Sequence, residues 1–279
     1  MLFGSALTSL GAWIYLSLFH GKFWQGGPTL KAGSSPPCAP DVAIVVPARD
    51  EAESIQSCLT SLLQQDYDGK LSVILVDDNS TDGTGDLARA VPDPHNRLIV
   101  LTGAPRPPGW SGKLWAVNQG AQKALNHIGP YGYILFTDAD IMHAPQHLAT
   151  LLAKAREDDL DMVSEMVALN CESSAERFLV PAFVYFFAML YPFAWTASER
   201  SRIAGAAGGT ILLRRRALER IGGIEAIRGA LIDDCTLAAH VKRSGGRLYL
   251  GHSELAWSVR PYRGAKDIWE MIARTAYVQ

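Results

Sequence analysis

Two carboxylates that close an apolar stretch are the residues best suited to chemistry in this chain. Residues 133–137 read YILFT, and Asp138 and Asp140 follow directly. Side chains alternate along an extended backbone, so two acids separated by one residue leave a strand end on the same side. Mg²⁺ takes one or two protein carboxylates and fills its other positions with water and substrate phosphates. The pair therefore predicts a Mg²⁺ or Mn²⁺ site that meets a nucleoside diphosphate; the alternative is an acidic surface turn.

Two earlier apolar runs also end in polar clusters. Residues 42–46 lead into Pro47-Ala48-Arg49-Asp50-Glu51, and residues 71–76 lead into Asp77-Asp78-Asn79. Apolar residues at helical spacing follow the first cluster, over 55–63. Strands that alternate with helices predict a mostly parallel sheet, whose ligands bind beyond the carboxyl ends of the strands. We therefore expect an α/β fold that gathers all three clusters on one rim.

A glycine-rich turn lies between these strands, in the sequence PGWSGKLWAVNQG of residues 108–120. Pro107 stands where a Walker loop needs its first glycine, and Leu114 where it needs Ser or Thr, so that loop is excluded. A turn that feeds a helix can still offer backbone N–H groups and Lys113 to a phosphate. The alternative is a flexible loop with an exposed lysine.

A second acidic pair, Asp233 and Asp234, lies near the other end of the chain. Leu237 and Val241 mark one helix face after it, and Gly245 is a stop signal, so the pair sits at a helix N-terminus. The helix dipole stabilises carboxylates there. Capping alone accounts for Asp233, whereas Asp234 is a candidate catalytic base.

Apolar segments suggest a membrane. Residues 1–19 carry no charge, and a transmembrane helix needs about 20 apolar residues, so we predict a transmembrane anchor over 1–21 and a Gly/Pro-rich linker over 22–40. Lys22 and Lys31 then place the rest of the chain in the cytoplasm. Residues 178–195 are rich in aromatics and interrupted by Pro181 and Pro192. They predict either an interfacial lip for a lipid acceptor or a buried core helix.

Composition excludes several classes of protein. The 26 basic and 28 acidic residues give a net charge of -2, so nothing indicates a nucleic-acid partner. The 4 cysteines are widely spaced with no Cys-x-x-Cys pair, so neither a zinc site nor a disulfide framework is expected, and reduced thiols fit a cytosolic domain. A hydrophobic content of 48% is enough for a sizeable core.

Taken in order, the motifs resemble the family-two, inverting glycosyltransferases with a GT-A fold. The resemblance is carried by residues 45–51 (VVPARDE), 76–84 (VDDNSTDGT), 138–140 (DAD), 208–209 (GG) and 233–234 (DD). More narrowly, residues 109–113 (GWSGK), 181–195 and 269–276 (WEMIARTA) are similar to the hopene-associated glycosyltransferases of hopanoid-producing bacteria.

The resemblance implies a role for each matching position. Glu51 and Asp78, with Pro47 and Ala48, would hold the base and ribose of a nucleotide sugar. Asp138 and Asp140 would bind the metal on its diphosphate, and Asp138 would also contact the donor. Asp234 would be the catalytic base. Lys113 and either Arg260 or Arg263 are candidates for the leaving phosphates. Two departures stand out, since the family often has Asn at Asp50 and Glu at Asp233.

These observations lead to one expected function and two alternatives. We expect a GT-A domain over 41–255, an amphipathic interfacial segment over 256–279, and a chain that continues beyond Gln279. Its activity would be metal-dependent, inverting transfer from a UDP-linked sugar to a lipid or lipid-linked acceptor in hopanoid metabolism. The protein would be located at the bacterial inner membrane, with the catalytic domain facing the cytoplasm. The alternatives are a non-catalytic nucleotide-sugar-binding scaffold of a membrane lipid pathway, which needs no base at Asp234, and a nucleotidyltransferase.

Overall fold

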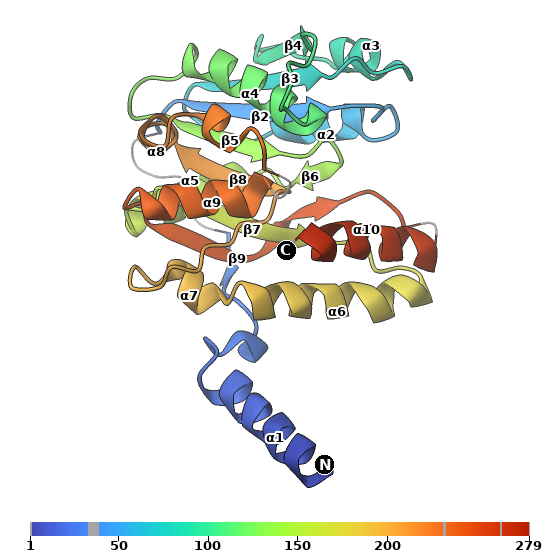
Figure 1. The fold of residues 1–279 in the computed structure, drawn as a ribbon. Helices are drawn as coiled ribbons and strands as arrows, with labels where there is room; N and C mark the ends of the chain where they lie inside the picture. Colours follow the sequence, from blue (N-terminus) through green and yellow to red (C-terminus); the bar gives the residue numbers. More distant parts are fainter. Residues whose placement is uncertain (1, 33–38, 231–232, 263, 279) are drawn as a thin grey trace.

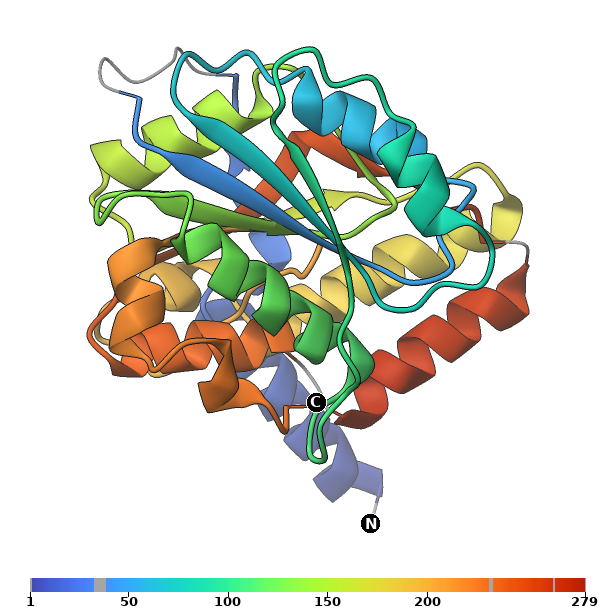
Figure 2. The same cartoon turned by 90° about the horizontal axis from the view of Figure 1, so that it is seen from above.

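The computed structural model describes residues 2–32, 39–230, 233–262 and 264–278 and shows a β-sheet with helices on both faces (Figures 1 and 2). Within this described part the sheet has 9 strands, of which eight follow the spatial order β1-β9-β7-β8-β5-β2-β3-β4, while β6 pairs with β9. The strands are β1 (Thr29–Leu30), β2 (Val42–Ala48), β3 (Leu71–Asp77), β4 (Leu98–Thr102), β5 (Tyr133–Thr137), β6 (Ile141–His143), β7 (Met162–Ala168), β8 (Thr210–Arg214) and β9 (Leu248–Ser258).

The sheet is mostly parallel, as the alternation of strands and helices predicted. β5, β2, β3 and β4 run parallel to one another, and so do β7, β9 and β1. β8 runs antiparallel to β5 and β7 and joins the two groups. The carboxyl ends of β2, β3 and β5 therefore meet at one edge, where ligands of such sheets bind.

Both faces of the sheet are buried, which explains the unbroken apolar runs of the central strands. In β2, Val42, Ile44 and Val46 pack under α2 (Ile55–Leu63), α3 (Thr84–Arg89) and α5 (His147–Glu157). Ala43 and Val45 point to the opposite face, under α4 (Gly112–Leu125), α8 (Arg215–Arg220) and α9 (Asp233–Arg243). A Cβ at Gly120 would collide with Val45, so this glycine lets α4 approach the sheet closely.

The aromatic segment buries some of its side chains in the core and leaves others exposed. It forms α6 (Ser174–Leu190) and α7 (Phe193–Ala197), and α6 begins at a capping box between Ser173 and Glu176. Phe187 of α6 packs in a third core cluster with residues of α7, α9 and β9. Phe178 is 80% exposed and Tyr185 is 46% exposed on the same helix. α10 (Ala265–Val278) lies alongside α6 (Figure 1).

The predicted transmembrane anchor over residues 1–21 is not confirmed. The corresponding helix α1 (Leu2–Leu18) has 17 residues, and at a rise of 1.5 Å per residue it is about 26 Å long, against about 30 Å for the hydrocarbon core. It stops because the chain turns into the left-handed region at Gly21 and Lys22. Across the described ranges, no helix has both the length and the apolarity to cross a bilayer. α1 is instead an exposed apolar helix that projects from the domain (Figure 1).

Part of the segment predicted as a linker, residues 22–40, is docked on the domain. The short helix η1 (Phe23–Gln25) buries Phe23, whose ring lies 5.2 Å from that of Tyr185. Nε2 of His20 is 2.8 Å from the carbonyl oxygen of Met189. β1 then adds to the sheet beside β9. The base of α1 is thus fixed against α6 and the sheet.

Candidate active site

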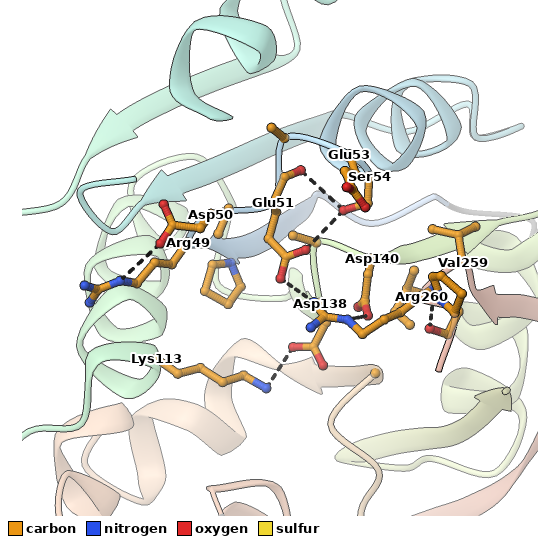
Figure 3. A pocket seen from close by; sticks show the side chains of 18 of the residues that line it. Arg49, Asp50, Glu51, Glu53, Ser54, Lys113, Asp138, Asp140, Val259 and Arg260 are labelled. Atoms are coloured by element: carbon orange, nitrogen blue, oxygen red, sulfur yellow. Dashed lines mark hydrogen bonds and ion pairs between the residues drawn. The ribbon is translucent and has the colours of Figure 1, made fainter. Parts of the chain in front are cut away.

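A cavity of about 1140 Å³ opens at the carboxyl ends of β2, β3 and β5 (Figure 3). Its lining includes every residue that the sequence predicted for the donor and the metal: Pro47, Ala48, Glu51, Asp78, Lys113, Asp138 and Asp140. Asp267, Glu270 and Met271 of α10 line it as well. The structure therefore brings the three strand-end clusters together, as the parallel sheet requires.

Hydrogen bonds lock the two loops that carry the first clusters. Asp50 has a left-handed backbone with φ 53°, and its Oδ1 accepts a hydrogen bond from the N–H of Thr81 at 2.8 Å. Asp and Asn both tolerate this conformation, so Asp50 suits a position where relatives often have Asn. Asp82 accepts from the N–H of Ala52 at 2.9 Å. The loop after β2 is thus held against the loop after β3.

Lys113 connects the two acidic pairs. It follows Ser111, which caps α4 by accepting a hydrogen bond from the N–H of Leu114. Its Nζ is 2.8 Å from Oδ1 of Asp138 and 4.0 Å from Oδ2 of Asp233. Burial by itself lowers the pKa of Lys113, but the two carboxylates outweigh burial and raise it. Lys113 therefore stays charged between the predicted donor site and Asp234.

Arg260 closes the cavity from the end of β9. Its Nε is 2.7 Å from Oδ2 of Asp140, and its Nη2 is hydrogen-bonded to Oε1 of Glu51 (Figure 3). Burial lowers the pKa of Arg260, and the charges of Asp140 and Glu51 outweigh that effect and raise it. Of the two arginines that the sequence left open, Arg260 is the one placed here; Arg263 lies outside the described residues.

The residues present fit a divalent cation whose remaining ligands come from a substrate. In the described part of the chain, no three His, Cys, Asp or Glu side chains stand close enough together to hold a metal by themselves. Asp138 and Asp140 each lie within ion-pair distance of a basic side chain, Lys113 or Arg260, so a bound ion would share these carboxylates with the two basic groups. Two carboxylates are the usual protein contribution to a Mg²⁺ site that also takes phosphate oxygens. Asp138 and Asp140 are thus the residues that would hold the ion.

Asp234 lies beside the large cavity and lines a small adjoining pocket of about 30 Å³. Lys113, Asp138 and Pro47 line both spaces, so the two are contiguous. Burial and then the charge of Asp233 raise the pKa of Asp234 to about 6. A Cβ on Gly208 would lie 3.3 Å from Oδ2 of Asp234, so the glycine keeps the space before this carboxylate open.

Asp233 is the first residue of α9 and accepts a hydrogen bond from the next backbone N–H. Its Oδ1 accepts a hydrogen bond from the N–H of Asp234 at 3.1 Å, at the first turn of α9. Asp234 in turn accepts from the N–H of Cys235 at 2.7 Å. Both acids line the small pocket, and Asp233 also lies 4.0 Å from Nζ of Lys113.

Sequence reasoning missed two groups of residues. Asp267, Glu270 and Met271 share one face of α10, and their spacing of three and four was a readable signal. His143 and His147 form a buried chain with Glu165, and sequence reasoning assigned no role to any of the three. Nothing in the sequence linked Glu165 to the two histidines.

Comparison with known proteins settles the family. A profile of glycosyl transferase family 2 matches residues 43–222, which is more than half of the chain. The chain belongs to glycosyl transferase family 2. This family 2 chain is 24% identical over 227 residues to the probable glycosyltransferase YdaM of Bacillus subtilis, covering 80% of the chain and 51% of that protein. It is 32% identical over 130 residues to an undecaprenyl-phosphate mannosyltransferase of Micrococcus luteus, covering 45% of the chain and 49% of that protein.

The chain spans about half the length of these two relatives. Among solved structures, the family 2 domain is similar to the mannosyltransferase PcManGT of Pyrobaculum calidifontis in complex with GDP-Man and Mn²⁺, with a TM-score of 0.70 and 24% identity over 100% of this chain and 73% of that one. At this identity the likeness shows the GT-A fold. The profile match ends before Asp234, so the family match does not reach the predicted base.

Proposed function

We propose that this family 2 protein transfers a sugar from a nucleoside diphosphate sugar to a hydroxyl group of a lipid or lipid-linked acceptor. The observation that carries the proposal is the contiguity of two spaces: a large cavity with Asp78, Asp138 and Asp140, and a small pocket with Asp234. A donor in the first would present its sugar toward the second. A scaffold that only binds nucleotide sugar has no use for a half-buried carboxylate there.

Each donor contact has a physical reason. Pro47 and Ala48 end β2 at the cavity floor, and Glu51 and Asp78 supply acceptors for ribose and base. A divalent ion held by Asp138 and Asp140 would neutralise charge on the departing diphosphate. Lys113 and Arg260 are cations already aimed into the same space and would contact the phosphates.

Asp234 would act as the general base. Its carboxylate would accept the proton of the acceptor hydroxyl while the hydroxyl oxygen forms a bond to the anomeric carbon. The bond from that carbon to the diphosphate breaks on the opposite face, so one displacement inverts the configuration. A pKa of about 6 leaves Asp234 largely ionised at neutral pH and still basic enough to take up a proton.

Apolar surface supports a lipid acceptor and membrane association. α1 exposes large apolar side chains on all sides, and α6 exposes Phe178 and Tyr185. Exposed apolar area of this kind marks an interaction with apolar partners. The Micrococcus luteus relative, by its name, acts on undecaprenyl phosphate, which agrees with a lipid-linked acceptor. We accordingly propose peripheral attachment to the bacterial inner membrane with the cavity on the cytoplasmic side.

Donor and acceptor identities are finer proposals. The fold neighbour in complex with GDP-Man and Mn²⁺ supports a nucleotide sugar and a divalent metal, Mg²⁺ or Mn²⁺. We propose a UDP-linked donor, and a hopanoid as the acceptor, from the resemblance of residues 109–113, 181–195 and 269–276 to hopene-associated enzymes. Neither relative nor neighbour named above is described as acting on hopanoids.

Thermal stability measurements test the donor site. The purified chain is heated with UDP, GDP and their sugars, with and without Mn²⁺ or Mg²⁺, since a ligand that binds the folded state raises the melting temperature. We expect metal-dependent stabilisation by one nucleotide, lost in Asp140→Ala. Asp86→Ala is the matched control, because Asp86 is exposed and lies outside the cavity. No stabilisation of the folded wild type by any nucleotide would contradict the proposal.

A further inference from the structure

A chain of buried polar side chains runs beneath the donor carboxylates. Oγ1 of Thr137 is 3.0 Å from Nε2 of His143, and Nδ1 of His143 is 2.8 Å from Nδ1 of His147. Nε2 of His147 is 2.9 Å from Oε2 of Glu165. These residues come from β5, β6, α5 and β7, and none is more than 3% exposed. The proposed reaction uses none of these four side chains.

The direction of each hydrogen bond follows from the end of the chain at Thr137. The hydroxyl of Thr137 lies 2.8 Å from the carbonyl oxygen of Gly209, which can only accept, so the hydroxyl donates its proton there. It must then accept from His143, which places a proton on Nε2 of that ring. The Nδ1 of neutral His143 is therefore an acceptor, and the donor to it is Nδ1 of His147.

The other end of the chain must hold one extra proton. A His147 ring that is protonated on Nδ1 and neutral has a lone pair on Nε2, which faces Glu165. The hydrogen bond between them exists only if Glu165 is protonated or His147 is cationic. Burial raises the pKa of Glu165 to about 7 and lowers that of His147 to about 3, so the proton rests on Glu165.

The groups that surround Glu165 modify this balance without replacing it. On β9, the hydroxyl of Ser253 and the nearby His252 both lower the pKa of Glu165, against the larger effect of burial. Burial in turn lowers the pKa of His252. Tyr249, also on β9, has its pKa raised by burial and then by Glu165, so it adds no charge near neutral pH. Burial and then His147 lower the pKa of His143.

Loss of the proton would reverse the whole chain. An ionised Glu165 only accepts, so His147 would carry its proton on Nε2 and accept on Nδ1. His143 would then donate from Nδ1 and accept on Nε2. The hydroxyl of Thr137 would turn to His143 and lose its bond to Gly209. The two protonation states therefore differ in one contact at the site: the side-chain bond from Thr137 to the carbonyl of Gly209, which adds to the backbone pairing of Thr137 with Thr210.

We propose that His143, His147 and Glu165 are positioning residues whose shared proton holds Thr137 to Gly209 and thereby sets Asp138 relative to the turn that faces Asp234. Thr137 directly precedes Asp138, and Gly209 follows Gly208, which stands before the Asp234 carboxylate. The inference rests on the proposed function for the roles of these two acids. It adds a link between Asp138 and Asp234 that runs through the protein itself and does not require a bound ligand.

Histidine tautomers give a direct test in the wild-type protein. We label the histidine rings with ¹⁵N, assign His143 by substitution, and record ring nitrogen shifts from pH 6 to 9. We expect the proton of the His143 ring to move from Nε2 to Nδ1 as pH rises through about 7. Glu165→Gln should remove the pH dependence of the His143 tautomer, because a glutamine amide neither gains nor loses a proton in this range.

Nucleotide binding shows whether the chain acts on the donor site. Affinity for UDP and for GDP with Mn²⁺ is measured calorimetrically at pH 6 and pH 8.5. Between pH 6 and pH 8.5 we expect the nucleotide affinity of the wild type to fall about five-fold more than that of Glu165→Gln. A difference of this size is the effect of one neutral hydrogen bond. Glu254→Gln is the matched control, since Glu254 is exposed on β9, and it should behave as the wild type.

Three outcomes would overturn the proposal. A wild-type His143 tautomer that does not change with pH contradicts the reversal itself. Nucleotide binding with equal pH dependence in all three proteins contradicts the link to the donor site and leaves the proposed function intact. No nucleotide binding at any pH contradicts the proposed function and this inference with it.

Discussion

The donor side of the cavity and the apolar side of the molecule differ in how their groups are matched. On the donor side three carboxylates each face a cation: Asp78 with Arg49 at 3.4 Å, Asp138 with Lys113 at 2.8 Å, and Asp140 with Arg260 at 2.7 Å. On the apolar side, α1 leaves Trp13 58% exposed and α6 leaves Phe178 80% exposed. The charges of the first region are paired within the chain, whereas the second region leaves large apolar side chains exposed.

This difference indicates two kinds of specificity. Paired charges at strand ends are held in place before a ligand arrives, so they can fix the position of a diphosphate. Exposed apolar side chains bind in proportion to the apolar area that is removed from water, and they constrain the orientation of the bound group only weakly. The donor should therefore respond sharply to single substitutions, and the acceptor side should respond to loss of apolar area. Single substitutions on the two sides can break that contrast.

Asp234→Asn should separate binding from transfer. The amide cannot accept the proton of the acceptor hydroxyl, so turnover should fall by about 10²–10⁴-fold, the range for loss of a general base. Metal-dependent nucleotide binding should persist because Asp234 lies outside the large cavity. Transfer assays and calorimetry measure the two effects. Asp233→Asn is the control and should retain most turnover; full activity in Asp234→Asn would refute the role of base.

A charge on α1 should weaken membrane attachment and spare the donor site. Trp13→Glu removes an exposed apolar side chain and adds a charge, and a large apolar group contributes about 1.5–3 kcal/mol when buried. We expect at least about ten-fold weaker partition into vesicles of bacterial lipid, measured by co-sedimentation. Gln56→Glu adds the same charge on exposed α2 and should partition as the wild type. Equal partition of all three would mean that α1 does not contact the bilayer.

Gly208→Ala should narrow the space before Asp234. The new methyl carbon would lie 3.3 Å from Oδ2 of Asp234 and 3.8 Å from Nζ of Lys113. We expect about a ten-fold loss of turnover, the effect of about 1.4 kcal/mol, with nucleotide affinity little changed. Gly229→Ala is the control, because a Cβ there meets nothing within 4 Å. Equal losses in both variants would assign the effect to the backbone instead.

The pH dependence of turnover should follow the ionisation of Asp234, and Asp233→Asn should shift it slightly in a predictable direction. A base must be ionised, so turnover should rise as pH increases through about 6. Burial and then Asp233 raise the pKa of Asp234, so Asp233→Asn should move this acid limb to lower pH. At pH 5.5 the variant should keep a larger share of its maximal turnover, by a few-fold. A limb that does not move would mean that another group controls it.

Local sequence predicted where the strand-end residues lie, because that geometry is local. Strands that end in polar residues place those residues at the sheet edge, so the positions of Glu51, Asp78 and Asp138 follow from the parallel arrangement. Arg260 could be named only as one of two candidates. Its partners are 120 and 209 positions away, and that pairing depends on how β9 packs.

The rest of the fold depended on features that periodicity does not report. Hydropathy made residues 1–21 look long enough to span a bilayer, but two left-handed residues, Gly21 and Lys22, stop the helix at Leu18. Glu165 lies in an apolar strand with no sign of a partner, because α5 brings His147 to it only after folding. Amphipathic α6 buries one face and exposes another, so neither simple alternative for that segment was complete.

The docked base of α1 has a consequence for orientation. His20 and Phe23 contact α6 just after the end of α1, so α1 joins the domain through a docked segment. Any surface that takes up α1 therefore also fixes which way the cavity mouth points. An enzyme attached in this way would lose its rotational freedom on attachment and not on meeting the acceptor, so the entropic cost of binding the acceptor would be smaller. A docked segment of a few residues thus lets the attachment of α1 also set the orientation of the cavity.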